Sequence, residues 1–194
     1  YESIPADHPL LLRLANIAAD NGVPIDIHFD PAVAEMKAPE WLEVPPNPAA
    51  FKANTAAFER LIAHNRNAKI GWAHAGSDML GHWTPALSRR MLAAHPNLFM
   101  SLRLGPGRAQ MSFPLLPNGQ IKPPWLALFG EFSDRFVIGN DQFFLGRGVS
   151  GGPAATFAQR ASKVRHNANR FLAALPPEIA RKIASENARR LYRL

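Results

Sequence analysis

The amino-acid sequence predicts an α/β protein with a parallel sheet, because short β-type runs alternate with segments of helical spacing. The four runs lie near residues 23–29, 68–74, 98–103 and 136–141. Each run places a polar, chemically capable side chain at its carboxyl end, namely His28, His74, Arg103 and Asp141. Reactive side chains at the carboxyl ends of parallel strands are typical of α/β enzymes, so the pattern predicts an enzyme.

The composition fits one globular domain that covers residues 1–194. Of the 194 residues, 47% are hydrophobic and 19% are charged, which is enough apolar material for a sizeable core. The absence of cysteine excludes disulfides, thiolate nucleophiles and cysteine-ligated zinc. It fits both the cytoplasm and the periplasm, and we slightly favour the cytoplasm.

The net charge of +7 raises the question of a nucleic-acid partner. The basic residues are scattered, however, with no run longer than pairs such as Arg89-Arg90. We therefore expect no nucleic-acid partner and attribute the charge to solubility or to attraction of an anionic substrate. Because no apolar stretch approaches the roughly 20 residues that span a bilayer, we also expect a soluble protein without membrane contact.

The first half of the chain predicts helix, strand, loop and helix in turn. Residues 9–21 carry apolar side chains at helical spacing, and Gly22 ends this helix because glycine adopts the left-handed cap conformation at little cost. The proline-rich loop 30–46 is unusually long, which favours a lid over the active site or a surface that packs on a neighbouring subunit. Residues 47–65 then predict a long helix, with Phe51 on its apolar side.

The second half of the chain repeats this alternation. A helix is expected over residues 85–95, because Pro85 suits the first turn of a helix. The other helices are expected at residues 125–132, 153–175 and 177–192, and the loops at 77–84, 105–124 and 142–152. The last of these loops is rich in glycine but lacks a phosphate-binding lysine motif, so we expect a flexible loop rather than a phosphate site.

Alternation along each strand brings the reactive groups to one face, since residues two apart point the same way. It places Asp26 on the face of His28 and Trp72 on the face of His74. In a barrel the four strand-end groups would meet at one mouth. Two imidazoles and a carboxylate are suitable ligands for a divalent metal that activates water, and they would serve equally as a metal-free acid/base set.

Two side chains are candidates for substrate binding. Arg103 offers a planar fork of donors that suits a substrate carboxylate. His82 lies in the 77–84 loop, on the same side of the predicted sheet as the strand-end groups, and would reach the substrate from there. We therefore expect a small, anionic substrate.

Several motifs resemble the amidohydrolase superfamily and, within it, the amidohydrolase-related or family 2 metal-dependent hydrolases. These motifs are VPIDIH ending at His28, WAHAG with His74 and Gly76, IGND ending at Asp141, HPNLFMSLR (His95–Arg103) and IASENARRLY (Ile183–Tyr192). They follow one another in the family's order over nearly the whole chain. The resemblance implies a (β/α)8 TIM barrel, of which this chain would supply about the last four βα units.

The resemblance also implies roles for individual residues. His28 matches a metal ligand, and His74 matches a histidine that binds a metal or orients the water and the substrate. Asp141 matches a metal ligand that is also the general base, although Asn140 stands where the family commonly has threonine or serine. The implied cofactor is a divalent metal, zinc in the first place and manganese as the alternative. Arg103 has no general role in the family.

The sequence departs from the family in one large respect. It contains no His-x-His pair, which in the family lies on the first strand and supplies half of the metal ligands. Four strands also cannot close an eight-stranded barrel. We therefore expect either the C-terminal half of a longer enzyme, which we favour, or two half-barrels that complete each other in a homo-oligomer.

The sequence thus predicts a metal-dependent hydrolase that acts on a small carboxylated amide, ester or lactone. Within the same superfamily, a non-oxidative decarboxylase is the first alternative and a metal-free lactonase the next. The missing His-x-His pair favours a third alternative of another class, a non-catalytic half-barrel that serves as a scaffold or oligomerisation module.

Overall fold

A parallel sheet forms the centre of the computed structural model, which describes residues 4–42, 44–45, 47–77, 80–105, 112–139 and 153–194, with side chains in the last range from residue 162. Its described strands are β1 (Ile25–His28), β4 (Ile70–Ala75), β5 (Leu98–Leu102) and β6 (Phe136–Ile138). They lie in the order of the sequence, and all neighbours run parallel. The predicted α/β fold with a parallel sheet is therefore confirmed. The arrangement is compatible with part of a TIM barrel, and the described residues form no closed barrel.

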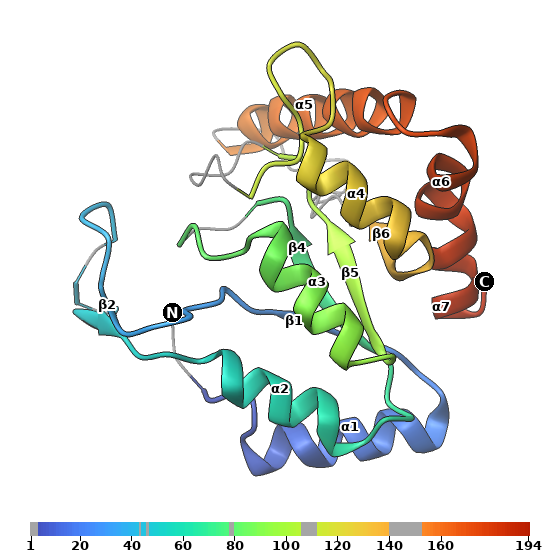
Figure 1. The fold of residues 1–194 in the computed structure, drawn as a ribbon. Coiled ribbons are helices and arrows are strands. Elements are labelled where there is room, and N and C mark those ends of the chain that lie inside the picture. The colour runs from blue at the N-terminus through green and yellow to red at the C-terminus, as the bar shows by residue number, and fades with distance from the viewer. Residues whose placement is uncertain (1–3, 43, 46, 78–79, 106–111, 140–152) are drawn as a thin grey trace.

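Helices connect consecutive strands and cover one face of the sheet. Figure 1 shows α2 (Thr55–His64), α3 (Pro85–Ala94) and α4 (Pro123–Glu131) on the same side of the strands, with α1 (Pro9–Asn21) beside α2. Gly22 ends α1 at φ 63°, as predicted, and its N–H donates to the carbonyls of Ala18 and Ala19. No helix in the described ranges is long and apolar enough to cross a membrane.

The core lies between the sheet and these helices. The fully buried side chains of the strands include Ile70, Trp72, Leu98, Met100, Leu102 and Phe136. Trp72 stacks on Trp83 with ring centroids 4.0 Å apart and meets Phe58 of α2 edge-on at 5.1 Å. The intervening residues of β1 and β5, such as Asp26 and Ser101, are more exposed and line the other face of the sheet.

The predicted helix 47–65 is wrong in its first part. Helix α2 begins only at Thr55, and Phe51 belongs to β3 (Ala50–Phe51), which pairs antiparallel with β2 (Met36–Lys37). The reason is Asn54, whose backbone N–H donates to the carbonyl of Ala32 at 2.9 Å while its Oδ1 accepts from the Ala32 N–H at 2.7 Å. These bonds hold the chain extended before the helix. The lid role of the 30–46 loop stays a prediction.

The C-terminal segment returns to the sheet and forms hydrogen bonds to both of its edge strands, β1 and β6. Helices α5 (Pro153–Ala173), α6 (Pro177–Arg181) and α7 (Asn187–Tyr192) end the chain, with the π-helical turn η2 (Lys182–Glu186) joining α6 to α7, and the 3-10 turn η1 (Ser133–Arg135) precedes β6. Asn187 is fully buried and donates to the carbonyls of Ser133 at 2.7 Å and Phe136 at 2.8 Å. The Tyr192 hydroxyl donates to Asp26 Oδ2 at 2.7 Å, which links α7 to β1.

His95 lies at the end of α3 and is only 5% exposed. Because of this histidine, the free energy of unfolding is expected to decrease as the pH is lowered below about 6.5. Burial lowers the pKa of His95 below its ordinary value of 6.5 more than the nearby Glu59 raises it. Below pH 6.5 the unfolded chain therefore binds more protons than the folded one, so the free energy of unfolding decreases down to the lowered folded pKa.

The substitution His95→Gln should remove this part of the pH dependence. Urea unfolding of both proteins above and below pH 6.5 would measure it. A native chain and a variant with the same loss of stability on acidification would contradict the assignment to His95.

Candidate functional site

Two histidines meet at the carboxyl ends of neighbouring strands. His28 is the last residue of β1, and His74 is the residue before the last of β4. Their ring centroids lie 4.3 Å apart with the planes inclined at 62°. The His28 side chain is 49% exposed, so the pair is open to solvent. The structure thus places together the first two residues that the sequence predicts for the site.

His74 reaches His28 through an irregularity in the strand. Ala73 pairs with Ser101 and Ala75 with Leu102, which leaves His74 as an extra residue in a bulge, at a left-handed φ of 76°. The prediction that Trp72 and His74 share a face is therefore wrong, because the bulge interrupts the alternation. A left-handed conformation costs a non-glycine residue about 1–2 kcal/mol, and such strain is concentrated at functional sites.

Arg103 lies beside the turn that follows His74. Its Nη1 donates to Ser77 Oγ at 3.2 Å, and the Ser77 N–H donates to the carbonyl of His74 at 3.0 Å. Gly76 makes this turn at φ 87°, where a Cβ would lie 3.3 Å from the carbonyl oxygen of Arg103. Ser77 therefore links the guanidinium of Arg103 to the backbone of the turn after His74. Its contact with a substrate carboxylate stays a prediction.

Two predicted site residues remain: His82, which the structure describes, and Asp141, which it does not. The backbone N–H of Val33 donates to His82 Nδ1 at 3.2 Å, which joins the loop after β4 to the loop after β1. His82 as a substrate-binding residue stays a prediction. Asp141 and the glycine-rich loop 142–152 lie outside the described residues, so the predicted roles of Asp141 as metal ligand and general base also stay predictions.

Asp30 lies next to His28, and the sequence reasoning did not single it out. Its Oδ2 lies 3.6 Å from His28 Nε2, and its side chain is only 11% exposed. Two bonds hold the neighbouring backbone: Trp72 Nε1 donates to the carbonyl of Phe29 at 2.7 Å, and Asn54 Nδ2 donates to that of Asp30 at 3.1 Å. The signal available in the sequence was a carboxylate two residues after a strand-end histidine.

The donor types at this site suit a divalent metal. Imidazole nitrogens and a carboxylate oxygen are ligands of zinc, and carboxylates also suit manganese. In the part of the chain that the structure describes, no group of three or more His, Cys, Asp or Glu side chains is close enough to hold an ion. His28, Asp30 and His74 therefore fit a metal in the kind of donor they offer, but by themselves they do not form a metal site.

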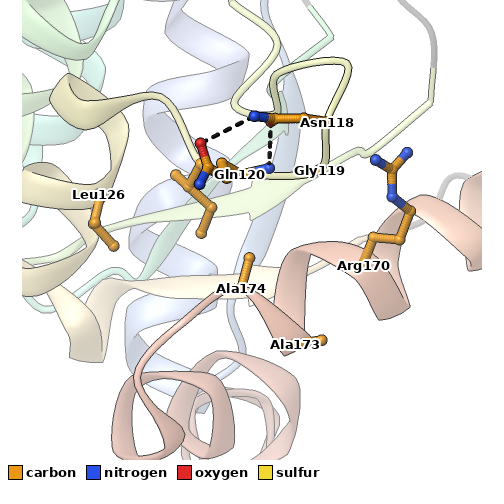
Figure 2. A pocket seen from close by; sticks show the side chains of 8 residues that line it. Asn118, Gly119, Gln120, Leu126, Arg170, Ala173 and Ala174 are labelled. Atoms are coloured by element: carbon orange, nitrogen blue, oxygen red, sulfur yellow. Dashed lines mark hydrogen bonds between the residues drawn. The ribbon is translucent and has the colours of Figure 1, made fainter.

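A shallow pocket of about 620 Å³ lies elsewhere, between the 118–121 turn, α4 and α5. Figure 2 shows Arg170 of α5 at its edge, opposite the turn in which Asn118 and Gln120 bond to each other. Its lining residues, all of them described, include no imidazole or carboxylate. The pocket therefore offers no acid/base or metal chemistry, and the histidine pair remains the candidate site.

Comparison with known protein families gives a match. The family model described as Amidohydrolase matches residues 1–194, which is the whole chain. The chain matches no curated protein and no solved structure. The match covers both strand-end histidines, Arg103 and Asp141 in a single span.

Proposed function

The chain belongs to the amidohydrolase family, and on this basis we propose that it is a metal-dependent hydrolase whose ion is held by His28, His74 and Asp141. The observation that carries the proposal is the 4.3 Å approach of the two imidazole rings, together with the left-handed backbone of His74. Zinc is the preferred ion and manganese the alternative. When bound, the ion would supply the Lewis acidity that makes water a nucleophile at neutral pH.

The chain's own residues would carry the remaining steps. Asp141 accepts a proton from the water that attacks the substrate carbonyl carbon, and returns it to the leaving nitrogen or oxygen as the scissile bond breaks. His74 orients the carbonyl group. Arg103, held against Ser77, donates to a carboxylate on the substrate, which favours a small carboxylated amide, ester or lactone.

The position of Arg103 also favours a second candidate function. A guanidinium held against Ser77, in the turn after His74, would orient the carboxylate that leaves as carbon dioxide in a non-oxidative decarboxylase. Product analysis separates the two, because hydrolysis yields two fragments and consumes water, whereas decarboxylation releases carbon dioxide.

We also propose that further strands complete the barrel. The four described strands form an open sheet, whose edges and exposed face would be covered in a closed barrel. An N-terminal half-barrel or a second copy of this chain would supply the missing strands. Either partner would bring additional ligands to the mouth of the barrel.

Titration of the native chain with zinc is expected to show stoichiometric binding, and His28→Ala to weaken it by about 100-fold, since one of a few ligands is lost. His166→Ala is the matched control, because this imidazole is exposed on α5 and should leave the affinity unchanged. Isothermal titration calorimetry measures both. A native chain without stoichiometric binding of zinc or manganese would favour the non-catalytic scaffold instead.

A further inference from the structure

We propose that Asp30 belongs to the metal site on which the proposed function rests, where it supplies a carboxylate oxygen next to His28. The separation of 3.6 Å between Asp30 Oδ2 and His28 Nε2 is too long for a hydrogen bond, for which donor and acceptor lie about 2.7–3.2 Å apart. Nitrogen and oxygen ligands of one tetrahedral ion, each at about 2.0–2.2 Å from it, stand roughly 3.4 Å apart. The observed spacing therefore fits two ligands of one ion.

The burial of Asp30 supports the same conclusion. Its side chain is 11% exposed, yet no described residue donates a hydrogen bond to its carboxylate, and His28 is its ion-pair partner in that part of the chain. Carboxylates that lose most of their hydration are normally paired or bind a cation. Since a histidine that binds a metal is neutral, a divalent ion between Asp30 and His28 would supply the positive charge next to the carboxylate.

The backbone holds Asp30 in place before any ion binds. Phe29, its predecessor, accepts from Trp72 Nε1, while Asn54 bonds to the carbonyl of Asp30 and to Ala32 on the other side. Ala32 is fully buried, so the segment is part of the packed structure and not a free surface loop. A ligand fixed in this way binds with little loss of conformational entropy.

The test compares two variants that each remove one negative charge from the same loop. Asp30→Asn keeps the shape of the side chain and should weaken zinc binding by about 10- to 100-fold. Glu35→Gln removes an exposed carboxylate and should leave the dissociation constant unchanged. Isothermal titration of zinc into the full chain gives both values, and thermal unfolding of the metal-free proteins shows whether each variant is folded.

Equal dissociation constants for Asp30→Asn and the native chain would overturn the proposal, as would an equal loss in both variants, which would reveal only an effect of net charge. If Asp30→Asn does not fold, Asp30→Ser takes its place with the same expectation. A native chain that binds no zinc and no manganese would refute the proposed function as well. Normal binding by the native chain with unchanged binding by Asp30→Asn refutes the role of Asp30 alone.

Discussion

Replacing His74 with glycine is expected to abolish tight metal binding while leaving the fold at least as stable as the native one. His74 holds a left-handed backbone at φ 76°, which costs a non-glycine residue about 1–2 kcal/mol. Glycine adopts this conformation freely, although it loses about 0.5–1 kcal/mol more backbone entropy on folding. The two effects leave a small net gain, whereas the lost imidazole should weaken zinc binding by at least about 100-fold.

The control for this prediction is His74→Ala, which removes the same imidazole but keeps a Cβ in the left-handed conformation. The free energy of unfolding from urea titration should be about 1 kcal/mol higher for His74→Gly than for His74→Ala. Metal titration should show the same loss in both. If His74→Gly is less stable than His74→Ala, the backbone at His74 is not strained. If both variants are less stable than the native chain, the ring contact with His28 stabilises the fold.

Elements with local boundary signals could be predicted from the sequence. Helix α1 spans Pro9–Asn21 as expected, because a proline in its first turn and Gly22 after its last turn act within a few residues. The order of the parallel sheet also follows from the alternation of runs and helices. For the same reason His28 and His74, at the ends of neighbouring strands, could be expected to lie close together.

Features that depend on distant contacts could not be predicted in this way. The late start of α2 results from bonds between Asn54 and Ala32, 22 residues apart in the sequence. The bulge at His74 arises from the pairing of β4 with β5, and it reverses the direction that strict alternation gives to the side chain. Asp30 stands near His28 because Trp72 and Asn54 fix its backbone, and neither bond leaves a pattern around Asp30 itself.

The largest loss of stability is expected for Trp72→Ala. Trp72 is fully buried, stacks on Trp83 at 4.0 Å, and donates from Nε1 to the carbonyl of Phe29 at 2.7 Å. Truncating a buried tryptophan to alanine costs about 3–5 kcal/mol, a large part of the 5–15 kcal/mol by which domains are typically stable. Urea unfolding should therefore show a strongly lowered midpoint. A loss below about 1 kcal/mol would contradict the central place of this residue in the core.

A matched pair of conservative variants separates packing from the hydrogen bond. Trp125 is also buried, at 1% exposed, but its Nε1 has no hydrogen-bond partner among the described residues. Trp72→Phe and Trp125→Phe remove the same atoms, so the additional cost at Trp72 is expected to be about 1–2 kcal/mol for the unpaired carbonyl of Phe29.

The same hydrogen bond is expected to matter for zinc binding, because Phe29 stands between His28 and Asp30 in the sequence. Trp72→Phe should thus also weaken zinc binding, whereas Trp125→Phe should not, and equal affinities would show that the hydrogen bond stabilises the fold without positioning the site.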